Sequence, residues 1–487
     1  MSPPPNILLI LTDQQRFDSL SCTGCNVIDT PNLDRLAQEG MLFENCICSS
    51  PVCTPSRASL WTGKDLPAHG VYRLYDDLDE HEILFPELLR RRKYRTGLFG
   101  KLHVSSLHKE AWKRHPNDGF DVYEWCNEAC LYMDSPLHGY RKWLEKRDPA
   151  FCRLLMREQR KLKHIPAELH FTRWAVEKNI EFISENIDRP WFACMSVFDP
   201  HNPYDCGPRD YFDAIDENRI PDPIPAAESG RPVAHLREAR EGYLGDINNF
   251  SNEDIRKMRR GYYSSLKFLD DEVGRVLRLL EKTGQLDHTL IIFSSDHGDM
   301  LGDHGLLVKG NFFFDACVRV PLLLRLPGRF EGGRRITENV QNFDIAPTIL
   351  SAAGYSAMEL AELMPGARDL ADENVFRDYV ICRYRNTGIR SGSRYWSAPE
   401  MHGTMIRDNR WKLCDYPLAG EGELYDLEND PLEFDNLWKK PEFRKIRQRL
   451  QSALQQQVSA AEYSHVSPGG QTLPPTGFQV DNRFDKE

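Results

Sequence analysis

Residues Asn6-Ile7-Leu8-Leu9-Ile10-Leu11-Thr12-Asp13 open the chain with a short apolar run that ends in a carboxylate. An apolar run of this length is typical of a strand that is buried on both faces of a sheet. A helix is expected next, because Thr30 can cap it, Pro31 suits its first turn and Gly40 can end it. The first elements therefore predict a strand followed by a helix.

The same alternation continues along much of the chain. Further strands are expected at residues 41–48, 96–99, 191–197, 289–294 and 320–326, and helices at 55–61, 253–281 and 343–352. The longest of these helices carries apolar residues at steps of three and four, the period of an amphipathic helix. This pattern predicts an α/β fold with a large, mostly parallel (mixed) sheet flanked by helices on both faces.

The length of 487 residues favours more than one domain. A large domain is expected over residues 1–371, with an insertion at about 105–173 that covers the cleft. Short strands and a polar terminal helix predict a smaller α+β domain over residues 372–466. Residues 467–487 contain Pro, Gly and polar residues and predict an irregular tail, either disordered or an arm that packs on a neighbouring subunit of a homo-oligomer.

Composition excludes some classes of protein. Apolar residues make up 40% and charged residues 28%, as in ordinary globular proteins, and the net charge is −11. This negative charge argues against a general nucleic-acid binder. No apolar stretch is long enough to span a membrane, and no signal peptide is visible. With 13 scattered cysteines, an odd number, these features predict reduced thiols and a cytoplasmic location, with a mature secreted form as the alternative.

Polar side chains follow four of the expected strands. Asp13-Gln14 and Asp296-His297 are two such pairs, and strand ends of an α/β sheet meet at one edge. Two carboxylates, an amide oxygen and an imidazole can bind Ca²⁺, Mg²⁺ or Mn²⁺. The simpler reading of an isolated Asp-His pair is a helix cap with a surface histidine. The pairing with Asp13 favours a metal site.

Basic residues are expected at the same edge, where they could surround a tetrahedral anion. They are Lys101, His103, His201 and Lys309. Fixed cations stabilise a sulfuryl or phosphoryl group best in its transition state, and a histidine can also transfer protons. Each of these residues considered alone is more simply a solvated surface residue. Their positions after expected strands, or after Asp296-His297, favour a functional role.

The segment Cys53-Thr54-Pro55-Ser56-Arg57, followed by Leu60, Thr62 and Gly63, is the most specific motif of the chain. Maturation enzymes recognise such a segment when they oxidise cysteine to formylglycine. The alternative is a loop cysteine before a helix that begins at Pro55. In that helix Arg57 would lie one turn after Cys53 and direct its charge back at the modified side chain.

With these segments the chain resembles the sulfatase family, part of the alkaline phosphatase superfamily. The resemblance covers most of the chain and also rests on residues 30–34, 100–103, 295–298, 423–427, 430–431 and 433. It implies hydrolysis of sulfate esters, with formylglycine at position 53 and a divalent metal. Ca²⁺ is the expected ion, with Mn²⁺ and Mg²⁺ as alternatives. The implied partners are a small-molecule or saccharide sulfate ester and a formylglycine-generating maturation enzyme.

The resemblance also implies a role for each site residue. Asp13, Gln14, Asp296, His297 and the modified Cys53 would bind the metal, and a hydroxyl of the hydrated aldehyde would attack sulfur. His201 with Lys309 would protonate or stabilise the leaving oxygen. His103 would take the proton of the second hydroxyl, which expels sulfate. Lys101 and Arg57 would hold positive charge near the nucleophile.

Two departures from the family pattern keep alternatives open. Gln14 stands where many relatives have Asp, and Leu102-His103-Val104 stands where Trp-His-Leu is commoner. An Asp-Gln pair also occurs in choline-sulfatase-like proteins and in phosphonate monoester hydrolases, which use the same formylglycine but lack the Lys-His pair. The chain could therefore be a phosphonate monoester or phosphodiester hydrolase, although Lys101 and His103 favour a sulfatase.

A catalytically silent binding relative is a further alternative. It is opposed by the presence of every chemical group that the reaction needs. A phosphatase or phosphomutase would need Ser or Thr in place of Cys53. The pocket walls are expected from the insertion at residues 105–173 and from residues 383–394 and 401–407. Their arginines and aromatic residues suit a sugar sulfate and an aryl sulfate equally well.

Overall fold

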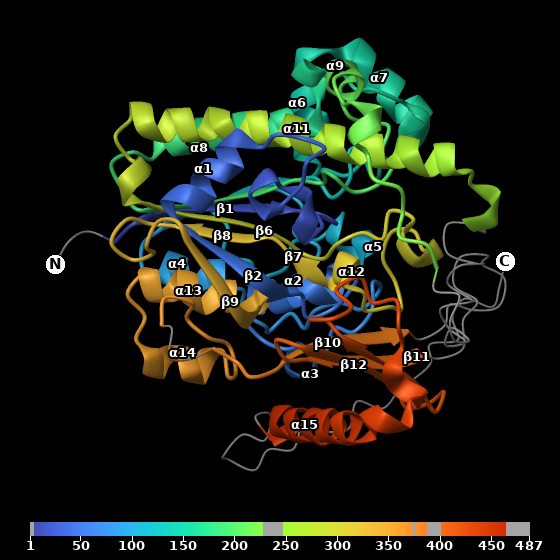
Figure 1. The fold of residues 1–487 in the computed structure, drawn as a ribbon. Coiled ribbons are helices and arrows are strands. Elements are labelled where there is room, and N and C mark those ends of the chain that lie inside the picture. Colours follow the sequence, from blue (N-terminus) through green and yellow to red (C-terminus); the bar gives the residue numbers. More distant parts are fainter. Residues whose placement is uncertain (1–3, 227–246, 373, 375, 387–400, 464–487) are drawn as a thin grey trace, which may run out of the picture.

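The structure is a computed structural model that describes residues 4–226, 247–372, 374, 376–386 and 401–463. The expected tail at 467–487 and part of the 383–394 segment lie outside these residues. The described residues form two sheets, a large mixed sheet of nine strands and a small antiparallel sheet of four (Figure 1). This arrangement confirms the predicted α/β architecture with a second, smaller α+β part.

The large sheet has the strand order β4-β3-β5-β1-β6-β8-β2-β7, and β9 pairs with β2. Its first five strands are parallel to one another, and β8 is antiparallel to β6. The strands are β1 (Asn6–Thr12), β2 (Met41–Ile47), β3 (Arg95–Gly100), β4 (Val122–Trp125), β5 (Trp191–Ser196), β6 (Thr289–Ser295), β7 (Arg319–Val320), β8 (Leu322–Arg325) and β9 (Arg334–Gln341). The expected strand at 320–326 is divided at Pro321, which has no N–H for a sheet hydrogen bond.

Helices cover both faces of the large sheet (Figure 1). On one face lie α1 (Pro31–Glu39), α8 (Phe171–Glu185) and the long α11 (Asn252–Lys282), and α8 and α11 contact each other. On the other lie α2 (Cys53–Thr62), α4 (Phe85–Arg91) and α13 (Ile345–Ala352). Each face has its own continuous apolar core, which explains why β1 is buried along its whole length.

The remaining helices are short or peripheral. They are α3 (Leu66–His69), α5 (Leu107–Glu110), α6 (Gly139–Arg147), α7 (Pro149–Glu158), α9 (Arg209–Asp213), α12 (Asp315–Val318) and α14 (Ala357–Leu363). The segment at 105–173, expected as an insertion over the cleft, contributes β4 to the edge of the large sheet beside β3. Its charged and aromatic composition concealed a strand of only four residues.

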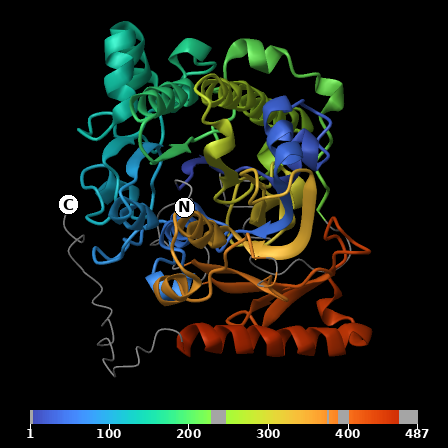
Figure 2. The same ribbon diagram turned by 90° about the vertical axis from the view of Figure 1, so that its left-hand side faces the viewer.

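The small sheet contains β10 (Val380–Asn386), β11 (Met401–Arg407), β12 (Trp411–Tyr416) and β13 (Glu421–Asp426). Helix α15 (Arg444–Tyr463) lies along its outer face, as Figure 2 shows. A separate apolar core with Ile406, Leu413 and Leu424 joins this helix to the sheet. Within the described ranges, no helix is long and apolar enough to cross a membrane.

Candidate active site

Cys53 is the first residue of α2, and its side chain is buried. The expected helix began at Pro55, but the observed one begins two residues earlier, so the thiol lies at the helix N-terminus. The partial positive charge of that terminus favours an anionic or polar group there. Burial raises the pKa of the Cys53 thiol, but the positive charges of Lys101 and Lys309 outweigh it and lower the pKa overall.

The strand ends bring the predicted polar residues together. Strands β3, β5, β1 and β6 are neighbours in this order, and Lys101, His201, Asp13 and Asp296 follow them. Gly100 makes this convergence possible at β3, because its φ is 121° and a Cβ there would lie 1.8 Å from the carbonyl oxygen of Ser196. The chain can therefore turn directly into Lys101.

Four of these side chains form a compact group that could hold a metal ion. The ligand atoms of Asp13, Cys53, Asp296 and His297 all lie within 4.8 Å of one another, and all four residues are buried. His297 contacts the carbonyl oxygen of Gly298 through Nδ1 at 2.9 Å, so that Nδ1 carries the proton and the Nε2 lone pair faces Cys53 Sγ at 3.1 Å.

Gln14 contacts this group through its backbone and has a side-chain oxygen that is free within the described part of the chain. Its backbone N–H donates to Asp296 Oδ1 at 3.1 Å, and its φ of 69° places it in the left-handed region. Its side-chain Oε1 is buried and has no hydrogen-bond partner among the described residues. A buried acceptor without a donor costs free energy unless a ligand satisfies it. Two carboxylates, this amide oxygen and an imidazole nitrogen fit Ca²⁺, Mg²⁺ or Mn²⁺.

Two cations hold the carboxylates of this group. Lys101 pairs with Asp13, and Arg57 Nε donates to Asp296 Oδ2 at 2.6 Å. Burial raises the pKa of Asp13, but Lys101 leads a set of positive charges that hold this pKa well below its usual value. Arg57, fully buried, also donates to the Lys101 carbonyl and to Ser196 Oγ. In this structure Arg57 therefore contacts the metal-site carboxylate.

Lys309 and His201 lie on the other side of Cys53. Lys309 Nζ donates to Cys53 Sγ at 2.7 Å and lies 2.7 Å from His201 Nε2. His201 Nδ1 lies 2.7 Å from the carbonyl oxygen of Asn202, which can only accept, so Nδ1 carries the proton. His201 Nε2 therefore accepts from Lys309, and the ammonium group bridges the histidine and position 53.

His103 is fixed by two neighbours. Its Nε2 lies 3.1 Å from Thr54 Oγ1, and that hydroxyl donates to the carbonyl oxygen of Leu74, so Nε2 must be the donor to Thr54. The carboxylate of Glu110 accepts from the backbone N–H groups of His103 and Val104. The remaining nitrogen, Nδ1, is buried and has no partner in the described part of the chain.

The sequence prediction missed several residues that support the site. Thr54 follows Cys53 and Ser196 ends an expected strand, but nothing in their spacing indicated a contact. Glu110 lies in the expected insertion, seven residues after His103 but outside every recognised motif, and its buried carboxylate also accepts from Trp125 Nε1. Asp299, two residues beyond His297, is bonded to Gln14. Its position two residues after the Asp-His pair was the only sequence feature that could have indicated a role in the site.

A second buried group also has residue types that could bind a metal, but several of its atoms form hydrogen bonds within the protein. His170, Asp199 and Cys206 lie close together, yet His170 Nδ1 accepts from the Thr172 N–H at the start of α8. Asp199 Oδ2 accepts from Thr172 Oγ1 at 2.5 Å, and Cys206 donates to the carbonyl oxygen of Pro203. These three atoms already contact the helix terminus and the adjoining loop, whereas His170 Nε2 and Asp199 Oδ1 are buried without a partner among the described residues.

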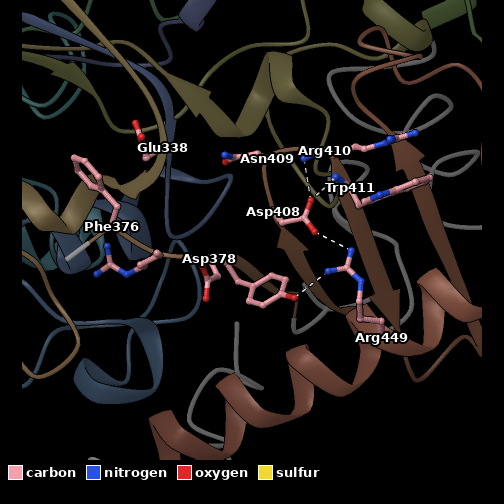
Figure 3. A pocket seen from close by; sticks show the side chains of 10 residues that line it. Glu338, Phe376, Asp378, Asp408, Asn409, Arg410, Trp411 and Arg449 are labelled. Atoms are coloured by element: carbon pink, nitrogen blue, oxygen red, sulfur yellow. Dashed lines mark hydrogen bonds and ion pairs between the residues drawn. The ribbon is translucent and has the colours of Figure 1, made fainter. Parts of the chain in front are cut away.

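An open cavity of about 550 Å³ lies between β9 and the small sheet (Figure 3). Its lining includes Asp378, Asp408, Trp411 and Arg449, and none of the predicted site residues. Arg449 is occupied by Asp408 and by the Tyr379 hydroxyl, as Figure 3 shows. The Cys53 group, with four potential metal ligands and the adjacent Lys309 ammonium, is therefore the candidate active site.

Comparison with known proteins shows similarity along most of the chain. A family model described as Sulfatase matches residues 5–355, and one described as N-sulphoglucosamine sulphohydrolase, C-terminal, matches residues 302–460. The chain is 28% identical to an arylsulfatase of Clostridium perfringens, covering 95% of this chain and 96% of that one. It is 31% identical to a choline-sulfatase of Rhizobium meliloti, covering 90% and 83%.

The same comparison with solved structures supports the fold. The crystal structure of a phosphonate monoester hydrolase of Agrobacterium radiobacter superposes with a TM-score of 0.77 at 26% sequence identity. The match covers 95% of this chain and 96% of that one. The predicted resemblance, including its choline-sulfatase and phosphonate monoester hydrolase branches, is confirmed.

Proposed function

The chain belongs to the sulfatase family, and on this basis we propose that it hydrolyses sulfate esters with a formylglycine at position 53 and a divalent metal. The observation that carries the proposal is the position of Cys53. Its sulfur lies beside Lys309 on one side and in the group of Asp13, Asp296 and His297 on the other. A nucleophile at this position would have cations and metal ligands around the group that it attacks.

The formylglycine and the metal would each supply part of the chemistry. Formylglycine at position 53 would supply a nucleophilic hydroxyl, and the metal would supply positive charge near it. Asp13, Gln14, Asp296 and His297 would hold the metal. The unpartnered Oε1 of Gln14 supports this donor set. Ca²⁺ is the proposed ion because oxygen donors predominate.

Lys309 and His201 would act on the leaving alcohol. The ammonium of Lys309 already lies within hydrogen-bonding distance of position 53, so it can reach the oxygen atoms of a sulfate ester attacked there. His201 accepts one of the three N–H groups of Lys309 and a second is directed at position 53, where a substrate would be attacked. We propose that Lys309 supplies the charge or proton and that His201 orients it.

His103 would act as the base. Its Nε2 is committed to Thr54, the residue after the nucleophile, while its Nδ1 is buried without a partner in the described chain. Among the two ring nitrogens, Nδ1 is therefore the one that can accept a proton. Glu110 holds the backbone at His103 and fixes the ring against motion of the loop.

Lys101 and Arg57 would act through the metal ligands. Lys101 pairs with Asp13, and Arg57 pairs with Asp296, so each holds a carboxylate in the orientation that the metal needs. Their charges also offset the repulsion between the two buried carboxylates. Both residues would therefore support the reaction indirectly.

A phosphonate monoester hydrolase is the second candidate, supported by the solved structure of such an enzyme. Paired assays separate the two: initial rates with 4-nitrophenyl sulfate and with 4-nitrophenyl phenylphosphonate, using protein matured by a formylglycine-generating enzyme. We expect a higher kcat/KM for the sulfate ester and no turnover of either substrate by Cys53→Ala. A higher kcat/KM for the phosphonate would favour the second candidate, and full activity of Cys53→Ala would refute both.

A further inference from the structure

The carboxylate of Asp299 lies directly against the side-chain amide of Gln14. Gln14 Nε2 donates to Asp299 Oδ2 at 2.6 Å, and the hydroxyl of Tyr204 donates to the same oxygen at 2.7 Å. The backbone N–H of Leu301 donates to the other carboxylate oxygen at 3.0 Å. Asp299 is fully buried and acts as the acceptor in all three contacts.

We infer that Asp299 is a positioning residue that sets which end of the Gln14 amide is available to the metal, an inference that rests on the proposed function. The oxygen and nitrogen ends of an amide are nearly equal in size, so shape alone does not fix its orientation. A carboxylate oxygen that accepts hydrogen bonds pairs favourably with the NH₂ end and unfavourably with the oxygen. The contact therefore leaves Oε1 as the free end.

The surrounding structure holds both partners in place. The backbone of Gln14 is anchored by its N–H to Asp296 Oδ1 and by its carbonyl, which accepts from the Tyr262 hydroxyl at 3.2 Å. Gly261 in α11 lets the chain at Tyr204 approach, since a Cβ there would lie 1.9 Å from the Tyr204 carbonyl oxygen. With the backbone fixed, the polarity of the side-chain contact decides which amide end faces away from Asp299.

This arrangement links the identity of residue 14 to that of residue 299. Glutamate has nearly the shape of glutamine, but Gln14→Glu would place a second carboxylate against Asp299. Asp299→Asn would offer a donor to the amide oxygen and so permit the inverted amide. In the double variant Gln14→Glu/Asp299→Asn, the asparagine can donate to the glutamate, and the favourable polarity returns with the direction exchanged.

The test is titration calorimetry of the full-length protein with CaCl₂ and, separately, with MnCl₂. We expect Asp299→Asn to weaken metal binding by about 10–100-fold, the usual effect of losing a residue that orients a metal ligand. The double variant should bind more tightly than Asp299→Asn by at least about tenfold, a coupling of the kind that double-mutant cycles measure between contacting residues. Tyr204→Phe, which keeps the Asp299–Gln14 contact, should lose much less affinity.

The outcomes separate this inference from the proposed function. If the unchanged protein binds neither ion, the proposed metal site is refuted. If it binds metal and Asp299→Asn binds equally well, the positioning role alone is refuted. The same holds if the effects of the two single substitutions simply multiply in the double variant. Thermal unfolding in the presence of EDTA shows whether each variant is folded before metal is added.

Discussion

The Cys53 site and the cluster around Lys412 are both buried and charged, but they differ in what their polar atoms contact. In the first, Gln14 Oε1 and His103 Nδ1 have no partner among the described residues. In the second, the Lys412 ammonium contacts the carboxylates of Asp315 and Glu433 and the Phe313 carbonyl oxygen. Buried charge can thus serve two purposes in one chain.

The second cluster joins the two sheets. Lys412 belongs to β12, and Arg407 on β11 donates to Asp315 and to Asn45 on β2 of the large sheet. The partners of Lys412 are all protein groups, so we expect Lys412 to contribute to the free energy of unfolding. At Cys53 the protein leaves acceptors open, which costs stability and is typical of binding sites. Variants in the two clusters should therefore have opposite effects.

The largest effect is expected for Lys309→Ala in the first cluster. Removing the ammonium group beside position 53 should reduce kcat/KM for a sulfate ester by about 10²–10⁴-fold, as for other losses of a proton-transfer group. The urea midpoint should stay the same or rise, because one buried charge is removed from an open site. Rates and urea unfolding of the same preparation test both statements. A large loss of stability would place Lys309 with the structural cluster.

Lys412→Ala should have the opposite effect, a loss of stability with little change in activity. It leaves Asp315 and Glu433 buried with fewer partners, and breaking a buried ion pair costs about 3–5 kcal/mol. The free energy of unfolding should fall by this amount, while kcat/KM of the folded protein at low temperature stays within a few-fold of the original. Lys440→Ala, on an exposed pair with Asp435, is the matched control and should change stability little. A catalytic defect without a stability defect in Lys412→Ala would contradict the division.

A metal ion should stabilise the folded protein through the Cys53 site and not through the Lys412 cluster. Adding CaCl₂ to chelator-treated protein at about 100 times its dissociation constant should raise the free energy of unfolding by about 2.7 kcal/mol. The gain should disappear in Asp13→Asn and persist in a folded Lys412 variant. Thermal unfolding with and without the ion measures it. A gain that survives in Asp13→Asn would mean that the ion binds elsewhere.

The smallest effect concerns pH in the second cluster. Burial raises the pKa of Glu433 to about 7, against the opposing charge of Lys412. Between the unfolded value near 4.5 and about 7, the folded state keeps a proton that the unfolded state releases, so this group makes stability fall as pH rises. Glu433→Gln should remove a slope of at most about 1.4 kcal/mol per pH unit. Urea unfolding of both proteins at pH 5, 6 and 7 tests this, and equal slopes would refute it.

The sequence predicted those parts of the fold that depend on local pattern. The apolar run before Asp13 and the three-and-four spacing of α11 gave elements close to the observed bounds. Strand β4 was missed because it has only four residues, three of them half-buried at a sheet edge, and so carries no continuous apolar signal. The start of α2 was misplaced because Pro55 marks an early helical position but not which one.

The candidate site likewise has a part that the sequence pattern predicts and a part that depends on side-chain geometry. Polar residues that follow parallel strands meet at one edge of a sheet, and this rule alone brings Asp13, Lys101, His201 and Asp296 together. The roles of Glu110, Thr54 and Asp299 could not be predicted, since each depends on a hydrogen bond between side chains or loops whose geometry sequence spacing does not encode. The contact of Arg57 with Asp296 is likewise a matter of side-chain geometry, which the spacing of the motif does not specify.

The most direct test of the central claim is the mass of the peptide that contains Cys53, from protein produced together with a formylglycine-generating enzyme. Conversion of the thiol to the aldehyde nucleophile predicts a mass about 18 Da lower than that of the cysteine peptide. A peptide with this mass would support the proposed nucleophile at the start of α2. An unmodified cysteine in protein that nevertheless hydrolyses sulfate esters would contradict it.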